Sequence, residues 1–311
     1  MLLKPKRLKR GATIGVIAPS SCDDIRKTHL AEKFLISEGF KVKMGKSCYK
    51  SYGYLAGSDE IRAKDINDMF KDDEVDGIIC LRGGYGSVRI IDLIDYEIIK
   101  NNPKVFVGYS DITALHIAIN QLSDLITFHG PMLSSDMIKD FKRYSYDYLF
   151  DNLLKEGKKK LENPKDEKIK CLVKGRTKGK ITGGNLALVT STIGTDYEID
   201  TKGKILILED IDEEPYRIDR MLNKLRLSGK LKDAEGIILG DFNNCIPNKR
   251  ENSLTLMEVI NDIIKPLNIP TVYNVKFGHC NPTMTIPLGI EIEMDSEKGK
   301  LLIDDTPTLK G

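Results

Sequence analysis

Residues 104–119 read KVFVGYSDITALHIAI, in which an apolar strand pattern changes to an apolar helix pattern within three residues. The strand pattern ends at Gly108, where the missing side chain permits a tight turn. Ser110 stands in that turn, and the helix pattern starts at Asp111. A hydroxyl placed in this way is exposed at the carboxyl end of its strand, and the first amides of the helix can stabilise an oxyanion beside it. The segment favours a nucleophile elbow in an α/β fold.

The same segment has a second interpretation. The hydrolase pattern G-x-S-x-G has another glycine where this chain has Ile112. A serine or aspartate in front of an apolar helix is also the usual N-cap residue. On these residues alone, Ser110 or Asp111 serving only as a cap is an equally good interpretation.

The surrounding sequence predicts the fold. Short β-branched runs alternate with stretches of helical period from Ala12 to about His129, which is typical of βαβ units and a parallel sheet. The strand candidates are 12–18, 77–81, 105–107 and 125–128, and the helix candidates between them are 23–39 and 58–70. Ser58 is placed as the N-cap of the second helix, and Gly39 as the stop of the first.

A second strand-to-helix turn, CLRGGYGSV at residues 80–88, holds three glycines in four positions. Backbone amides in such a turn form a concavity that accepts anions. The segment lacks the lysine of a P-loop and the spacing of G-x-G-x-x-G, so an oxyanion hole or a carboxylate site fits as well as a phosphate site. Both turns are expected at the same edge of the sheet, where open α/β folds bind ligands.

The chain divides at a charged segment. Residues 155–170, KEGKKKLENPKDEKIK, are nearly devoid of large apolar side chains. We expect an N-terminal domain over 1–156, a linker over 157–170 and a C-terminal domain over 171–311. A long surface loop within one domain is the alternative. The second half is predicted to contain buried strands at 204–208 and 236–239 and a helix over 215–228 that begins at a proline.

A serine nucleophile needs a base, and the chain has four histidines. His29 lies in a polar helix pattern, and His116 is expected to point into the packing of its own helix. His129 ends a predicted strand, and His279 lies in a Gly- and Pro-containing loop, KFGHCNPTMTIPLG, after a strand pattern. Because catalytic groups concentrate on loops between rigid elements, His279 ranks slightly ahead of His129.

The base in turn needs a carboxylate to orient it. Glu209 ends the strand pattern KILILE, so its side chain is expected to emerge where a buried strand meets a loop. The other interpretation is that the acidic residues 209–214 favour the first turn of the helix beginning at Pro215. That interpretation suits Glu213 and Glu214 better than Glu209.

Composition limits the partners. Lys and Arg (48) nearly balance Asp and Glu (46) among 311 residues, so net charge favours neither nucleic acid nor an anionic membrane as a partner. The six cysteines lack C-x-x-C spacing, which argues against a zinc site or redox pair. The N-terminal residues lack the apolar region of a secretory signal, and no stretch is long enough to span a membrane. We expect a cytoplasmic protein that binds a small molecule or peptide and uses no metal.

With these residues in view, the chain resembles the LD-carboxypeptidases (muramoyltetrapeptide carboxypeptidases), a family that includes the microcin C immunity peptidases. The resemblance runs from about Ala12 to Ile303. It rests on seven segments that are specific as a set: GVIAPSS (15–21), LRGGYGS (81–87), VGYSDIT (107–113), FHGPM (128–132), GGNLALVTSTIGT (183–195), LILEDIDEEPYRIDRML (206–222) and GHCNPTMTIPLG (278–289).

The resemblance implies a triad of Ser110, Glu209 and His279, with an oxyanion hole from the backbone amides of Gly84 and Asp111. It also implies an N-terminal flavodoxin-like domain joined to a smaller α/β domain with β-barrel-like structure, in a homodimer. Arg82 is a candidate partner for the substrate carboxylate, or a brace for its own loop.

The reaction implied is hydrolysis of the bond between L-Lys or meso-diaminopimelate and D-Ala in murein tetrapeptides, during peptidoglycan recycling and without a cofactor. Two alternatives remain open. One is a hydrolase of microcin-like peptidyl-nucleotides that provides self-immunity, for which an aromatic side chain would stack on the nucleobase. The other is a non-catalytic protein that holds an anionic ligand in the two turns.

Overall fold

The structure is a computed structural model that describes residues 2–248 and 252–310, and it divides into two compact α/β units. The first unit comprises the chain up to Glu156, Thr285–Gly289 and the residues from Pro307 onward. The second comprises Gly157–Met284 and Ile290–Thr306. Two short C-terminal segments that the sequence placed with the second half therefore belong to the first unit.

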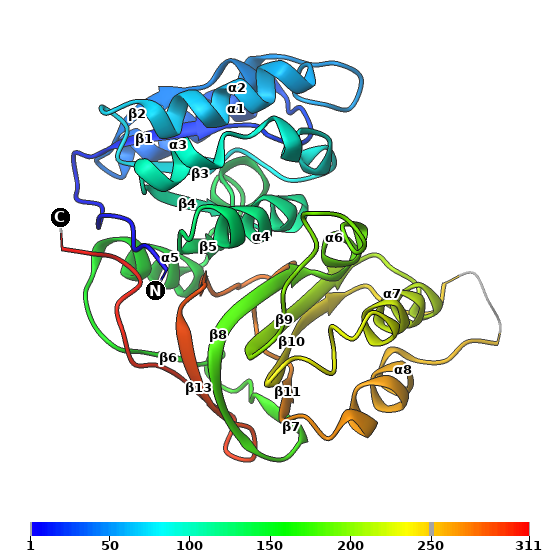
Figure 1. Ribbon diagram of the computed structural model, residues 1–311. Coiled ribbons are helices and arrows are strands. Elements are labelled where there is room, and N and C mark those ends of the chain that lie inside the picture. Colours follow the sequence, from blue (N-terminus) through cyan, green and yellow to red (C-terminus); the bar gives the residue numbers. More distant parts are fainter. Residues whose placement is uncertain (1, 249–251, 311) are drawn as a thin grey trace. The chain divides into compact units, whose positions relative to one another are not determined.

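The first unit is built on a six-stranded sheet in the order β12-β5-β4-β3-β1-β2 (Figure 1). Strands β1 to β5 are parallel, and β12 is antiparallel to β5. The parallel order 2-1-3-4-5 is that of flavodoxin-like folds, as predicted. The strands are β1 (Thr13–Ile17), β2 (Lys41–Met44), β3 (Gly77–Cys80), β4 (Val105–Gly108), β5 (Thr127–His129) and β12 (Ile286–Leu288).

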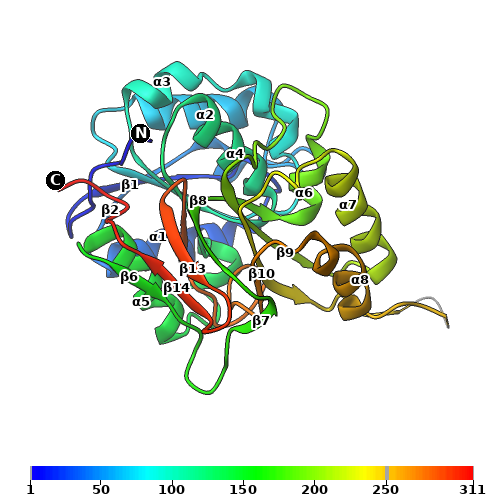
Figure 2. The same ribbon diagram turned by 60° about the horizontal axis from the view of Figure 1, so that its bottom comes forward.

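Helices cover both faces of this sheet. Figure 2 shows α1 and α5 on one face and α2, α3 and α4 on the other. The helices are α1 (Ile25–Ser37), α2 (Asp59–Lys71), α3 (Tyr96–Asn101), α4 (Thr113–Leu122) and α5 (Arg143–Leu154), with short 3-10 or π-helical segments at η1 (Lys46–Tyr49), η2 (Ser87–Leu93), η3 (Ser110–Ile112) and η4 (Leu133–Met137). The Ser58 side chain accepts from the Ile61 N–H, and Gly39 has φ 81°, so the expected helix start and stop are confirmed.

The second unit contains an eight-stranded mixed sheet in the order β6-β14-β13-β8-β9-β10-β11-β7. Its strands are β6 (Lys159–Leu161), β7 (Lys170–Val173), β8 (Arg176–Asn185), β9 (Lys204–Ile211), β10 (Gly236–Asn243), β11 (Thr271–Tyr273), β13 (Glu291–Asp295) and β14 (Lys300–Ile303). Its helices are α6 (Leu186–Ser191), α7 (Pro215–Leu227), α8 (Leu256–Ile263) and the turn η5 (Lys265–Leu267). Residues 157–170, expected to be a linker, contribute β6 to this sheet.

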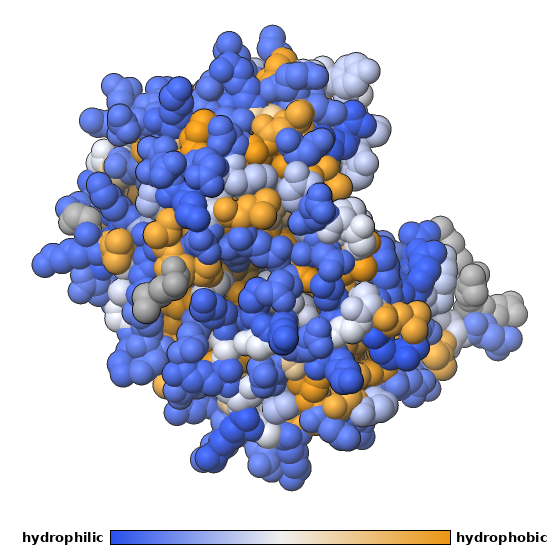
Figure 3. Space-filling view, viewed as in Figure 1, coloured by the Kyte–Doolittle hydropathy of each residue, from blue (hydrophilic) through white to orange (hydrophobic). Residues whose placement is uncertain are grey.

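The surface is mostly hydrophilic, and on the face drawn in Figure 3 hydrophobic residues form small scattered patches. None of the helices in the described part of the chain combines the length and apolar character that a bilayer crossing requires. Apolar side chains are instead buried against the sheets; one such cluster, which includes Ile78, Phe106 and Leu115, packs β3, β4 and α4 together. This core holds the ends of β3 and β4, from which the candidate site is built.

Candidate active site

Ser110 has a strained backbone. It follows the end of β4 and opens the turn η3, with φ 62°. A residue with a side chain is costly in this left-handed region, and such residues cluster at functional sites when the surrounding structure holds them there. A helix cap does not need this conformation, because N-cap residues have extended backbones. The backbone therefore favours the elbow over the simple cap.

The missing second glycine of the hydrolase pattern has a local explanation. Ile112 is fully buried, and its side chain lies 2.9 Å from where a Cβ on Gly108 would be. The two positions are therefore complementary: Gly108 leaves the space that Ile112 fills. This chain makes the turn with one glycine and a packed isoleucine.

The glycine turn, residues 81–87, passes directly over Ser110. A Cβ on Gly83 would lie 3.1 Å from Ser110 Cβ and 3.3 Å from Ser110 Oγ. Gly84 has φ 117°, and a Cβ there would lie 2.3 Å from Ser21 Oγ, which also accepts a hydrogen bond from the Tyr85 N–H at 3.1 Å. A side chain is excluded at Gly84 and would crowd Ser110 at Gly83, so the turn brings bare backbone against the serine. The expectation that both turns meet at one sheet edge is correct.

Asp111 follows the serine and is 1% exposed. Its Oδ2 accepts hydrogen bonds from Ser20 Oγ at 2.5 Å and from the Ser87 N–H at 2.8 Å. Burial raises the pKa of this carboxyl, although these hydrogen bonds oppose the rise. Its side chain thus fastens the serine's turn to two neighbouring loops.

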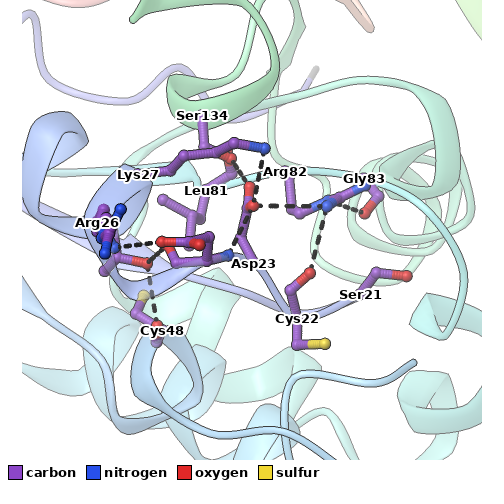
Figure 4. A network of polar contacts seen from close by, with 12 residues as sticks. Ser21, Cys22, Asp23, Arg26, Lys27, Cys48, Leu81, Arg82, Gly83 and Ser134 are labelled. Atoms are coloured by element: carbon purple, nitrogen blue, oxygen red, sulfur yellow. Dashed lines mark hydrogen bonds and ion pairs between the residues drawn. The ribbon is translucent and has the colours of Figure 1, made fainter. Parts of the chain in front are cut away.

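Arg82 lies in a polar network around Asp23 (Figure 4). Its Nη1 donates to the Cys22 carbonyl at 3.2 Å and lies 3.7 Å from Asp23 Oδ1, while its Nε donates to the Gly83 carbonyl at 3.3 Å. These contacts brace the glycine turn, and the Arg82 side chain remains 34% exposed.

Asp23 is nearly buried, and it also accepts from Ser134 Oγ and pairs with Lys27 at 3.3 Å. Burial raises the pKa of Asp23, but these hydrogen bonds and cations outweigh that effect and lower it overall. The cluster of Asp23, Lys27 and Arg82 therefore carries one net positive charge.

The second unit pairs Glu209 with His279. Glu209 lies in β9 with no exposed surface, and its Oε2 is 2.7 Å from His279 Nδ1 and 3.2 Å from the His279 N–H. Gly278 has φ 90°, and a Cβ there would lie 2.4 Å from Glu209, so this position also requires glycine. A carboxylate at Nδ1 fixes that nitrogen as the protonated one and leaves Nε2 as the basic atom.

The neighbouring acidic residues have other roles. Asp210 accepts from Asn185 Nδ2 and from the N–H groups of Ala187 and Ile211, which fixes the start of α6. Burial and the adjacent Glu209 raise its pKa to about 6 against these hydrogen bonds. Glu213 pairs with Arg217 of α7 at 3.3 Å, as expected for a helix start. Among the acidic residues 209–214, Glu209 is thus the one that contacts the imidazole of His279.

The other histidines have different surroundings. His29 is exposed on α1, as expected. His129 ends β5 at 1% exposure, with its ring packed against Tyr109 at a centroid distance of 5.8 Å. His116 is fully buried in α4, and its Nε2 donates to the Gly108 carbonyl at 2.8 Å. His279 differs from these three, because its side chain is 13% exposed and its Nδ1 contacts the buried Glu209 carboxylate.

His116 gives a prediction for stability against pH. Burial lowers its pKa to about 4 from an ordinary value of 6.5, although the Gly108 carbonyl opposes this. Between these pH values the unfolded chain binds more protons than the folded chain. We expect the free energy of unfolding to fall by about 3 kcal/mol as pH decreases through this window. His116→Gln, which keeps an N–H donor, should flatten the urea-unfolding profile between pH 6.5 and 4; an unchanged slope would contradict the assignment.

Several residues of this site had no role in the sequence analysis. Ser20 and Ser21 lie in the quoted segment GVIAPSS, and Asp23 lies at a predicted helix start, but nothing in their pattern showed what they contact. Their partners are 64 to 111 residues away in sequence, on the glycine turn, the elbow and η4. Among the described residues, no group of three or more His, Cys, Asp and Glu is arranged to hold a metal ion.

Comparison with known proteins identifies the family. Residues 14–130 match the LD-carboxypeptidase N-terminal domain, and residues 178–294 match the LD-carboxypeptidase C-terminal domain. A probable murein peptide carboxypeptidase of Bacillus subtilis is 47% identical over 97% of this chain and 94% of its own length. The microcin C7 self-immunity protein MccF of Escherichia coli is 28% identical over 95% and 94%.

A solved structure agrees with this assignment. The muramoyltetrapeptide carboxypeptidase from Oxalobacter formigenes superposes with a TM-score of 0.83 at 29% identity, covering 96% of this chain and 100% of that one. The two family domains cover most of the chain, in the order that the resemblance implied. The chain belongs to the LD-carboxypeptidase family of serine peptidases.

Proposed function

We propose that this protein is a serine LD-carboxypeptidase that hydrolyses the bond between L-Lys or meso-diaminopimelate and D-Ala in murein tetrapeptides. The observation that carries the proposal is the strained Ser110, held at φ 62° with bare glycine backbone packed against its hydroxyl. The buried Glu209 paired with His279 supplies a base of the required tautomer. The murein substrate is supported by the name of the 47% identical relative.

The proposed mechanism uses these groups in sequence. His279 Nε2 takes the proton from Ser110 as Oγ attacks the carbonyl carbon, and Glu209 stabilises the imidazolium. The amides of Gly84 and Asp111 receive the oxyanion. The imidazolium then gives its proton to the departing amine of D-Ala, which leaves an acyl-enzyme. Water, deprotonated by the same imidazole, hydrolyses the ester and restores the Ser110 hydroxyl.

Arg82 is proposed to bind the free carboxylate of the terminal D-Ala. The cluster of Asp23, Lys27 and Arg82 has one net positive charge, which one carboxylate would neutralise. Arg82 is partly exposed, and it belongs to the glycine turn whose Gly83 packs against Ser110. Asp23 and the Cys22 carbonyl hold one edge of the guanidinium, which leaves other N–H donors for a ligand.

The direct test is to incubate the protein with tetrapeptides containing L-Lys or diaminopimelate and to measure released D-Ala by chromatography. A serine-reactive phosphonate, followed by mass spectrometry of the peptide containing Ser110, tests the nucleophile independently of the substrate. Release of D-Ala together with labelling of Ser110 would support the proposal. Stabilisation by the peptide without product or labelling would instead identify a binding protein.

For Arg82→Gln we expect KM for the tetrapeptide to rise about 10- to 50-fold, with kcat changed by less than about threefold, because a charge-assisted contact to the carboxylate is lost. A tetrapeptide with a C-terminal amide should be a poor substrate for both proteins and should hardly distinguish them. Arg143→Gln, which changes an exposed arginine of α5 paired with Asp147, is the matched control. An equal loss of activity on the free and the amidated peptide would show that Arg82 only braces its turn.

A peptidyl-nucleotide substrate is the second candidate. It is supported by the similarity to MccF and by two exposed aromatic side chains, Tyr85 of the glycine turn (51% exposed) and Tyr54 (63%), whose ring centroids are 5.8 Å apart. The chain has no tryptophan, so tyrosine or phenylalanine would have to stack on a base. Hydrolysis of aspartyl sulfamoyl adenosine at a kcat/KM above that for murein tetrapeptide would favour this reading.

Location and assembly complete the proposal. All six cysteines are free, which fits a reducing compartment, and we propose that the enzyme acts in the cytoplasm. The homodimer implied by the family resemblance is tested by sedimentation equilibrium.

A further inference from the structure

Two buried charged side chains, those of Arg62 and Asp111, contact the same two loops near Ser110. Arg62 of α2 is 0% exposed, and Asp111 of the elbow is 1% exposed. Arg62 Nη1 donates to the carbonyls of Pro19 at 2.6 Å and Gly86 at 2.7 Å. The Asp111 carboxylate accepts hydrogen bonds from Ser20 and Ser87, which directly follow Pro19 and Gly86 in the sequence. Buried charges in this arrangement form charge-assisted hydrogen bonds that fix the backbone they contact.

The Gly86–Ser87 peptide is held from both ends. Its carbonyl oxygen accepts from the Arg62 cation, and its N–H donates to the Asp111 anion at 2.8 Å. A peptide dipole between a cation at its oxygen and an anion at its N–H has one favoured orientation. Ser87 Oγ also donates to the Asp111 backbone carbonyl, so the glycine turn and the elbow are joined twice.

The space around this peptide is closed. Gly86 has φ 133°, and a Cβ there would lie 2.7 Å from Leu55 and 2.9 Å from Arg62 Nη1. The other end of Arg62 pairs with Asp59, which in turn pairs with Arg89. The guanidinium is therefore anchored on α2 independently of the turn, as a positioning group needs to be.

We infer that Arg62 and Asp111 act together as positioning residues that clamp the Gly86–Ser87 peptide and thereby aim the glycine turn at Ser110. The inference rests on the proposed function, since it assigns the clamp to placing the Gly84 amide where the oxyanion forms. The Asp111 carboxylate has this positioning role in addition to the oxyanion-binding role proposed for the Asp111 backbone amide. Neither side chain touches the substrate in this proposal; both act through the turn.

The test uses variants of the full chain that separate position from charge. Asp111→Ala should lower kcat about 10²-fold with KM nearly unchanged, because a displacement of about 1 Å at an oxyanion donor has that effect. Asp111→Asn keeps an oxygen for Ser20 and Ser87 and should stay within about tenfold of the parent protein, although the buried amide lowers its Tm. Arg62→Met should resemble Asp111→Ala. The double variant should lose about as much as either single one rather than the product, because both hold one peptide.

Lys104→Met is the matched control. Lys104 is a buried cation of the same unit that donates to the backbone carbonyls of Met69 and Asp72, away from the elbow. The Lys104→Met substitution should lower Tm without lowering kcat. The clamp would be refuted by a folded Asp111→Ala with kcat within about threefold, by multiplicative losses in the double variant, or by an equal kcat loss in Lys104→Met.

A measurement that needs no turnover keeps this inference separate from the proposed reaction. Hydrogen exchange of the amides in residues 82–88 should speed up at least about tenfold in Asp111→Ala and stay unchanged in Lys104→Met. A parent protein that neither cleaves peptide nor reacts with phosphonate would defeat the proposed function. Exchange would then still decide whether the clamp holds the turn, and unchanged exchange would refute it.

Discussion

Ser110→Ala is expected to lower kcat by a factor on the order of 10⁵ or more, because attack on the carbonyl then depends on water alone. The Cβ is retained, so the packing against Gly83 and the fold should persist. The phosphonate label should be absent from the variant. Steady-state release of D-Ala and mass spectrometry check both statements.

Ser123→Ala is the matched control for this variant. Ser123 is a fully buried serine of the first unit, and its Oγ donates to the Tyr96 carbonyl at 2.8 Å. This change should reduce stability slightly and leave kcat unchanged. Substantial turnover by a folded Ser110→Ala would show that another group performs the attack, and the proposed reaction would be wrong.

Glu209→Gln should lower kcat about 10³- to 10⁴-fold with a small change in KM. The carboxylate fixes the proton of His279 on Nδ1 and stabilises the imidazolium, and an amide of the same shape does neither reliably. The replacement should keep the hydrogen bond from the His279 N–H, so the loop carrying the histidine should stay in place. The pH dependence of kcat/KM is the informative measurement, since a general base must be deprotonated to act and the acidic limb of the profile therefore reports it.

Asp210→Asn is the control for a change of buried charge at the next position. Asp210 is 3% exposed, and its partners lie at the start of α6 rather than on the imidazole. We expect altered stability and kcat within about threefold of the parent protein. If Glu209→Gln and Asp210→Asn reduced kcat equally, the loss would report damage to β9 and not the loss of an orienting carboxylate.

Much of the first sheet was predictable because its central strands are fully buried and read as continuous apolar runs, such as GIIC and VFVG. β2 was missed because KVKM is an edge strand with alternating exposed residues and only four positions. β12 was missed for another reason. It comes from a proline-containing loop more than 150 residues after β5, and local periodicity carries no information on such a return.

Ser110 and Glu209 became candidates because each follows or ends a buried strand pattern, whereas the residues alone ranked His279, next to Gly278, only slightly ahead of His129. The left-handed backbone of Ser110 could not be predicted, since a serine does not indicate a positive φ. The burial of Arg62 could have been predicted from the sequence. Arg62 lies four and seven residues before Ile66 and Met69, so it is on the apolar face of the helix, where a charged side chain needs a buried partner. That partner could not be named, because the Pro19 and Gly86 carbonyls come from other loops.

The strand β12 has a consequence for any attempt to cut the gene in two. A fragment ending at Glu156 would lack the segment that pairs with β5, together with the C-terminal residues whose backbone bonds to Pro5 and Arg7. Strand β5 would then present unpaired backbone N–H and C=O groups at the sheet edge, and such an edge can pair with strands of other copies. The first unit is thus completed only by segments from Thr285 onward, so a chain truncated before them is expected to expose this strand edge and to aggregate.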